Sequence, residues 1–275
     1  MLRVSWQRKN RAGFTLIELV IVLVVIATLA GLAIPLVSML VRSSNMAASA
    51  SNQQELANNI ELYFALQKRY PQGMDSLVDA SGAIYASDTT DANTQSYGLP
   101  YAGADGTRMQ AQLTAGTLTN AANAEYLRSF TRSGFDWVHD HDTTVVNSNN
   151  SGVTFRGLIA NANNTGNTAP TSFNVAEVTG SALITKLLPG GLPANSRLVA
   201  LGIGGRNTAI GKTLTAAPVY PGADGKYYGR FIAVFQVFAS GERTVLVGVV
   251  DPYGRTTDYT IQQFNESLPN GGRQD

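Results

Sequence analysis

The chain has 275 residues, of which 44% are hydrophobic and 14% charged, with 20 Lys and Arg against 19 Asp and Glu and no cysteine. A sequence without cysteine excludes disulfide scaffolds, cysteine-ligated zinc, iron–sulfur clusters and thiol nucleophiles. The balanced charge excludes a strongly basic nucleic-acid binder, so we expect no nucleic acid among the partners.

The first predicted element is an apolar helix near the N-terminus. Residues 19–41 contain no charged side chain. At about 1.5 Å per residue a helix of this length spans about 35 Å, which is enough to cross a bilayer core of about 30 Å. By the positive-inside rule, the short tail before it stays in the cytoplasm and the rest of the chain lies outside. The basic side chains of that tail are Arg3, Arg8, Lys9 and Arg11.

A secretory signal peptide is the alternative interpretation, because a basic segment followed by an apolar one is its usual form. The apolar run is too long for a typical signal peptide, and a carboxylate, Glu18, stands at its leading edge. The small residues 47–50 still resemble a signal-peptidase site. This alternative therefore stays open.

Residues 11–19 read RAGFTLIEL, which combines a Gly-Phe junction, an acid five residues past the Gly and a long apolar run. This pattern resembles the class III leader of type IV pilins and pseudopilins. The resemblance implies that a prepilin peptidase cuts between Gly13 and Phe14, removing residues 1–13 as a leader, and that the same enzyme N-methylates Phe14. It also implies a role in assembly for Glu18, and Pro35 matches the proline that kinks the helix in this family.

The chemistry of Glu18 and Pro35 supports the resemblance. A carboxylate in a membrane segment is costly and points to a functional partner. Cleavage would create an amine at Phe14, about one helical turn from Glu18, and the two groups can neutralise each other on the same or on neighbouring subunits. An acid that merely snorkels to the membrane boundary is the alternative. Pro35 lacks a backbone donor and should kink the helix, although a tolerated transmembrane proline has the same sequence.

The helical pattern continues beyond the apolar run. One amphipathic stripe, with Gln53 as its polar member, predicts that the helix extends to the Tyr70-Pro71 pair. We therefore expect residues 14–41 to form a transmembrane or filament-core half and residues 42–70 an amphipathic half that packs on a head, residues 71–275. A permanent single-span anchor is the alternative. The stripe consists of Met46, Ala50, Gln53, Ala57, Ile60 and Phe64.

The head is predicted to be α+β, with an antiparallel sheet packed on the second half of the long helix, as the pilin resemblance also implies. Short helices are expected at 120–132, with Asn120 as the cap, and at 179–188. Strands are expected at 153–160, 197–202, 230–238, 243–250 and 256–262, with a hairpin loop at 239–242 and a turn at 251–254. Residues 143–176, rich in Asn, Thr, Ser and Gly, are expected to form a polar surface loop.

The head offers little chemistry. Related pseudopilin heads bind calcium near the C-terminal loop, so the resemblance makes Asp251 and Asp258 candidate calcium ligands, and no other cofactor is expected. His139 and His141 would share one face of a strand and suggest a two-histidine metal site, but no third ligand is identifiable. No recognisable nucleophile arrangement is present, so we do not expect an enzyme.

Together these features predict a structural subunit of a type IV pilus or a type II secretion pseudopilus. The resemblance implies as partners other copies of the chain, other pilins, the prepilin peptidase and methyltransferase, and an inner-membrane assembly platform. The precursor is expected as a single-pass protein of the inner membrane with its head outside the cytoplasm, and the mature chain in a pilus or periplasmic pseudopilus. The alternatives are a membrane-anchored extracytoplasmic enzyme and a calcium-dependent adhesin.

Overall fold

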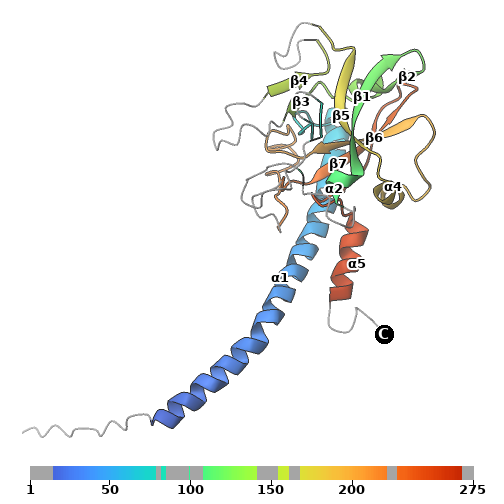
Figure 1. Cartoon of the computed structure of the whole chain (residues 1–275). Helices are drawn as coiled ribbons and strands as arrows, with labels where there is room; N and C mark the ends of the chain where they lie inside the picture. The colour runs from blue at the N-terminus through green and yellow to red at the C-terminus, as the bar shows by residue number, and fades with distance from the viewer. Residues whose placement is uncertain are drawn as a thin grey trace, which may run out of the picture. The chain divides into compact units, whose positions relative to one another are not determined.

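The computed structural model describes residues 15–78, 82–84, 99, 108–140, 154–160, 168–221 and 228–267. The chain divides into two compact units, Met1–Ser44 and Asn45–Asp275, and each is described by itself. In chain order the elements are numbered α1 to α5 and β1 to β8 (Figure 1).

The long predicted helix corresponds to α1 (Leu16–Gln67). It ends three residues before Tyr70 because Lys68 takes a left-handed conformation with φ of 59°. The N–H of Lys68 donates to the carbonyl of Phe64 at 2.7 Å, which closes the last turn. Within the described residues, no helix combines the length and the apolar character that crossing a membrane requires.

The head is built on a six-stranded antiparallel sheet with the order β2-β1-β5-β6-β7-β8. A separate antiparallel pair joins β3 to β4. The sheet strands are β1 (Leu113–Ala121), β2 (Ala124–Glu125), β5 (Ser172–Val178), β6 (Ser196–Gly202), β7 (Ile232–Phe238) and β8 (Val245–Val250), and the pair is β3 (Trp137–Asp140) with β4 (Thr154–Gly157). The helices after α1 are α2 (Met109–Gln112), α3 (Tyr126–Arg132), α4 (Ser181–Leu187) and α5 (Thr257–Ser267).

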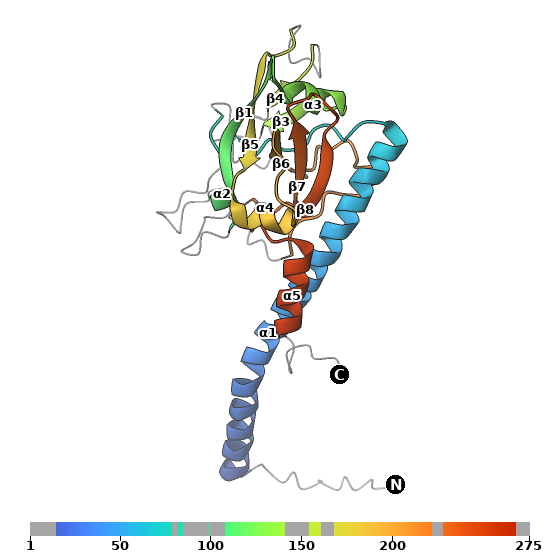
Figure 2. The ribbon, with the colours of Figure 1, turned by 90° about the vertical axis from the view of Figure 1, so that its right-hand side faces the viewer.

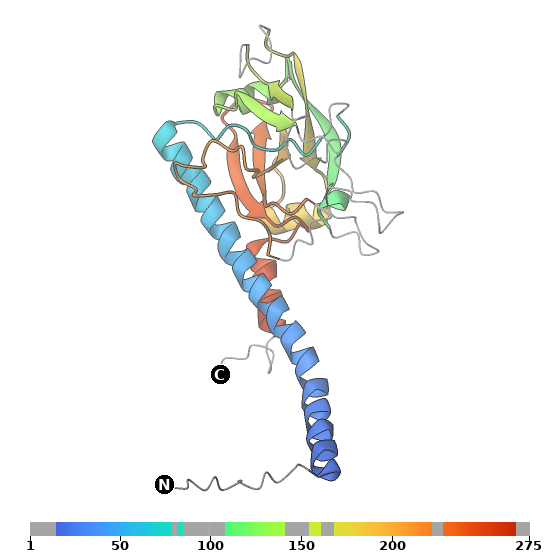
Figure 3. The same cartoon turned by 90° about the vertical axis from the view of Figure 1, so that its left-hand side faces the viewer.

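The central strands β6 and β7 of the sheet are buried on both faces. Alternate residues of β7 belong to two different hydrophobic clusters, since successive side chains of a strand point to opposite faces. Phe235 packs in the cluster that includes the C-terminal half of α1 and α3, whereas Val234 packs in the cluster that includes Leu183 of α4. In Figure 3 the cyan end of α1 runs along β7 and β8. The predicted α+β fold with an antiparallel sheet is therefore confirmed.

Four of the six residues in the predicted amphipathic stripe of α1 are buried, and Ala57 and Phe64 are half-buried. Ile60 and Gln53 are 0% and 1% exposed, and Met46 is also buried. Gln53 is satisfied by polar partners from the C-terminal region: its Nε2 donates to the carbonyl of Arg255, and its Oε1 accepts from Thr257 Oγ1, both at 2.9 Å. Figure 2 shows α5, which begins with Thr257, beside α1.

Three sequence predictions for the head were wrong. Residues 120–125 do not begin a helix, because β1 continues to Ala121, but Asn120 Oδ1 does cap α3 by accepting from the N–H of Arg128 at 2.7 Å. Residues 256–262 do not form a strand. Thr256 and Thr260 are both buried, and this four-residue spacing belongs to the helix α5.

The polar segment 143–176 is likewise not wholly a surface loop. It contains β4 and most of β5, and the alternate residues Phe173 and Val175 of β5 are buried. β4 lies within the strand predicted at 153–160, whereas β5 was missed, because β-propensity reflects packing against neighbours more than residue type.

Candidate functional site

The first turn of α1 holds Glu18 in a reciprocal cap. The backbone N–H and the Oγ1 of Thr15 donate to Glu18 Oε2 at 2.9 and 3.0 Å, and the N–H of Glu18 donates back to Thr15 Oγ1 at 3.3 Å. Thr15 precedes the helix and Glu18 is its third residue, so the pair forms a capping box. The Thr-x-x-Glu spacing of residues 15–18 is a sequence signal for this cap, although the class III leader motif does not by itself point to it.

The other N-terminal candidates are placed less fully. Gly13 and Phe14 lie outside the described residues, so the cleavage and methylation site stays a prediction. Pro35 lies within α1, which is continuous from Leu16 to Gln67. Its side chain is outside the described part of the chain, and the predicted kink is untested.

The first unit of the chain leaves the apolar side chains of α1 uncovered. Leu16 is 82% exposed, and even the least exposed of the set, Val20, is 46% exposed. The set comprises Leu16, Ile17, Leu19, Val20, Ile21, Val22, Leu23, Val24, Val25, Ile26, Leu29, Val37, Leu40 and Val41. Exposed apolar surface of this extent marks a site of interaction with a membrane or with other proteins.

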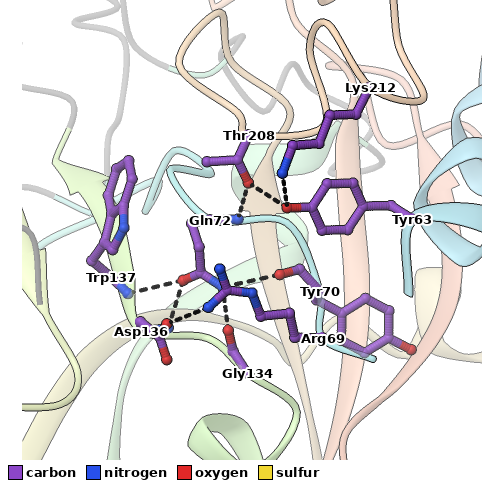
Figure 4. A network of polar contacts seen from close by, with 9 residues as sticks. All are labelled: Tyr63, Arg69, Tyr70, Gln72, Gly134, Asp136, Trp137, Thr208 and Lys212. Atoms are coloured by element: carbon purple, nitrogen blue, oxygen red, sulfur yellow. Dashed lines mark hydrogen bonds and ion pairs between the residues drawn. The ribbon is translucent and has the colours of Figure 1, made fainter. Parts of the chain in front are cut away.

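In the head, the chain just after α1 is fixed by the side-chain amide of Gln72 (Figure 4). Its Nε2 donates to the carbonyls of Tyr70, at 2.9 Å, and Gly134. Its Oε1 accepts from the backbone N–H groups of Asp136 at 2.5 Å and Trp137 at 3.1 Å. Gln72 is 3% exposed, so these bonds form away from water. One side chain therefore ties the exit of α1 to the start of β3.

The same junction is joined to the loop after β6. The backbone N–H of Gln72 donates to Thr208 Oγ1 at 2.8 Å, and Thr208 Oγ1 also lies 3.2 Å from the hydroxyl of Tyr63. Lys212 Nζ lies 3.5 Å from that hydroxyl and 5.3 Å from the centre of the ring. At the surface of the junction, Arg69 Nη1 and Asp136 Oδ2 form an ion pair of 3.0 Å. The last turn of α1 is thus held from two sides (Figure 4).

Tyr70 carries both apolar and polar contacts at this junction. Its ring stacks on Phe135 with centroids 5.4 Å apart and meets Phe235 edge-on at 5.1 Å. Its hydroxyl accepts from the N–H of Leu246 in β8 and donates to Glu61. Burial raises the pKa of Tyr70 well above its ordinary value, and the charge of Glu61 raises that pKa further. Burial also raises the pKa of Glu61.

The candidate calcium ligands Asp251 and Asp258 have different environments. Asp251 is 0% exposed, and its carboxylate accepts hydrogen bonds from the N–H groups of Tyr253 and Arg255 and from the guanidinium of Arg255. Burial raises the pKa of the Asp251 carboxyl, and the Arg255 charge offsets part of that rise. Burial lowers the pKa of Arg255, but the charges and hydrogen bonds of Asp251 and Tyr220 together outweigh burial, so the pKa is raised. Asp258 is exposed in the first turn of α5.

Only one member of the suggested histidine pair lies within the described residues. His139 lies in β3 and is 5% exposed, with Nδ1 3.2 Å from Asp75 Oδ1. The hydroxyl of Tyr228 donates to the other oxygen of Asp75 at 2.7 Å. His141 lies outside the described residues. Among the side chains that the structure describes, no group of three His, Asp or Glu could hold a metal ion.

Comparison with known families concerns the N-terminal segment. Residues 8–34 match the prokaryotic N-terminal methylation motif. That range contains the Gly-Phe junction, the capping box of Thr15 and Glu18, and the start of the exposed apolar face. This motif supports the resemblance to pilins and pseudopilins.

A relative supports the pilin and pseudopilin assignment. The type II secretion system core protein G of Aeromonas hydrophila is 32% identical to this pilin-like chain over 76 residues. The match covers 26% of this chain and 53% of the relative, so it spans about half the length of that protein. No solved structure matches the chain. The resemblance predicted from the sequence is confirmed.

Proposed function

We propose that the mature chain is a subunit of an extracytoplasmic filament, either a type IV pilus or a type II secretion pseudopilus. In this proposal the prepilin peptidase removes residues 1–13, N-methylates Phe14, and copies then assemble through α1. The observation that carries the proposal is the uncovered apolar face of α1 next to a methylation motif.

The magnitude of the apolar face explains why α1 should assemble. Fully burying one Val, Leu or Ile side chain is worth about 1.5–3 kcal/mol. Leaving the exposed apolar side chains between Leu16 and Val41 in water therefore loses burial free energy on the order of 20 kcal/mol or more. A lipid bilayer or the helices of other copies would recover this free energy. We accordingly place the precursor in the inner membrane as a single-pass protein and the mature chain in the filament.

Glu18 supplies the second step of the proposal. In the uncut chain the capping box holds the Glu18 carboxylate against the N–H of Thr15. Cleavage would place a charged amine at Phe14, the residue next to Thr15. A carboxylate and an amine buried together in an apolar filament core stabilise each other, whereas either one alone is costly. Pairing between neighbouring subunits would therefore set their axial register. Assembly would also need the membrane platform and other pilins that the family uses.

Two variants test the proposal. Gly13→Val replaces the small residue that precedes the predicted cleavage site with a β-branched one. This variant should accumulate as full-length precursor. Glu18→Ala should still be cleaved, but its filament yield should fall at least about tenfold, the effect of losing about 1.4 kcal/mol per subunit contact. Glu55→Ala is the control, because Glu55 is an exposed acid on the same helix outside the first turn.

The measurements are intact-mass spectrometry of the mature N-terminus and electron microscopy of sheared filaments. A methylated Phe14 terminus in the wild type, together with intact filaments from Glu55→Ala, is the expected result. An unprocessed wild-type chain would overturn the cleavage step. Normal filaments from Glu18→Ala would overturn the pairing step and leave the cleavage step standing.

A further inference from the structure

The turn that follows β8 contains an ion pair between a fully buried carboxylate and a half-buried arginine, which concerns the stability of the head and goes beyond filament assembly. Asp251 Oδ2 accepts from Arg255 Nε at 2.7 Å. Asp251 Oδ1 accepts from the N–H groups of Tyr253 and Arg255, each at 2.9 Å. With three donors on a carboxylate that is 0% exposed, both of its oxygens are already used.

The guanidinium of Arg255 is held as firmly as the carboxylate. Its Nη2 donates to the hydroxyl of Tyr220 at 2.6 Å. Its central carbon lies 5.4 Å from the ring centre of Tyr220 and 5.1 Å from that of Tyr253, within the range of cation–π attraction. A planar guanidinium suits such a site, because it donates along fixed directions while its faces rest on aromatic rings.

The residues of this turn do not fit a calcium ion. Calcium takes six to eight oxygen ligands at about 2.3–2.6 Å. The Asp251 oxygens point at three N–H donors, and the ion would stand against the positive charge of Arg255. Asp258, the other candidate ligand, is exposed on α5, and the described residues supply no cluster of three acids or histidines.

We infer that the guanidinium of Arg255 is the resident cation of this turn, so that the head folds here without calcium. The consequence extends to α1. The carbonyl of Arg255 accepts from Gln53 Nε2 at 2.9 Å and from the N–H of Asp251 at 3.1 Å. By fixing the turn, Arg255 directs its own carbonyl at the one polar member of the buried stripe of α1. The ion pair thereby fastens the C-terminal region of the head to the long helix.

The first test is thermal unfolding of the full-length wild-type protein in detergent, once with millimolar calcium and once with a chelator. The midpoint temperatures should agree within about 1 °C. Calorimetric titration of the chelated protein with calcium chloride should show no saturable binding at this turn. A fall of the midpoint by about 5 °C or more on chelation, or calcium binding that Asp251→Asn abolishes, would overturn the inference.

The second test compares two arginines. Arg255→Gln removes the partner of a buried carboxylate and should lower the unfolding midpoint by about 10 °C. Arg128→Gln is the matched control, since Arg128 pairs with Glu125 three residues away on the surface, and it should shift the midpoint by less than about 3 °C. Arg255→Lys keeps the charge without the fork of donors and should fall between them. Equal midpoints for Arg255→Gln and the control would refute the role given to Arg255.

Discussion

Replacing Gln72 by leucine should destabilise the head strongly, because its buried side-chain amide makes four hydrogen bonds at the exit of α1. The Gln72→Leu change keeps a similar volume and removes the carbonyl and the NH2 group. The N–H of Asp136 then loses its acceptor, and the N–H of Trp137 loses this bond. The carbonyls of Tyr70 and Gly134 each lose a donor.

The loss in free energy of unfolding depends on whether the polar groups that lose a partner can form hydrogen bonds with water instead. A buried polar group left without its partner costs about 1–3 kcal/mol. The Asp136 N–H bears most of that cost, and the carbonyls bear less because a carbonyl has a second lone pair. The added apolar surface of leucine offsets part of the total. We therefore expect a loss of about 4 kcal/mol, which lowers the unfolding midpoint of a head of this size by about 8–16 °C.

Denaturant titration of the full-length protein, followed by tryptophan fluorescence, measures this loss. Hydrogen exchange provides the local readout, since the amides of Asp136 and Trp137 should exchange faster in the variant. The control is Gln54→Leu, which changes an exposed glutamine of α1 and should cost less than about 0.5 kcal/mol. The reasoning fails if Gln72→Leu unfolds within about 1 kcal/mol of the wild type, or if both amides keep their protection.

Three further predictions concern the head. A Cβ on Gly202 would stand 1.8 Å from the Tyr228 hydroxyl, so Gly202→Ala should cost about 2–4 kcal/mol in denaturant titration, and adding Tyr228→Phe should cost less than the sum of the single changes. Lys68 occupies a left-handed position with φ of 59°, so Lys68→Gly should raise the free energy of unfolding by about 0.5–1 kcal/mol in the same assay. The raised pKa of Tyr70 means that the folded state disfavours its ionised form, so the stabilisation is complete below the unfolded pKa of about 10 and declines above it. Between pH 10 and 11, Tyr70→Phe should therefore lose stability less steeply than the wild type, and parallel profiles would contradict this assignment.

Sequence patterns predicted the elements whose packing follows a simple period. The stripe of α1 and strands β6, β7 and β8 are strongly apolar on their buried faces, and all were located from the sequence. The stripe even predicted one polar position, Gln53, whose half-buried partners lie 202 and 204 residues away along the chain. Sequence reasoning could place Gln53 on the buried face, but it could not identify Arg255 and Thr257 as its partners, because those contacts depend on tertiary structure.

The wrong secondary-structure predictions concern segments whose burial depends on residues far away in the sequence. β1 is rich in Thr and Ala, and β5 mixes polar with apolar residues, yet they pair over seven residues, from Leu113 opposite Val178 to Thr119 opposite Ser172. Their strand conformation is stabilised by that pairing and by the cores on either face, which no local propensity reports. α5 was taken for a strand because Thr256, Thr257 and Thr260 are β-branched, whereas its helical packing shows only in the four-residue spacing of its buried side chains.

The sequence identified Glu18 as a functional residue of the candidate site, but it did not identify the partner of Glu18 in the structure. Glu18 was identified from the cost of a carboxylate in an apolar segment, but the partner that the structure provides is Thr15. The two interpretations are compatible, because a capping box satisfies Glu18 while the chain is uncut and an amine can compete for the same carboxylate once Phe14 is the terminus. The partner of Glu18 would then depend on processing, and this is consistent with a helix that must be stable as a precursor and still available for assembly.

A head without cysteine must hold its C-terminal region by other means, and the structure contains two. The Asp251–Arg255 ion pair fixes the turn after β8. The backbone carbonyl of Arg255 accepts a hydrogen bond from the Gln53 side chain on α1. At the other end of the buried stripe, Tyr70 receives the N–H of Leu246 from β8. The strand and the turn that follows it are thus attached to α1 at two separated points. Each attachment uses a backbone group of the C-terminal region and a side chain from the helix or its exit, so weakening either one should loosen the edge of the sheet while the core between α1 and β7 stays packed.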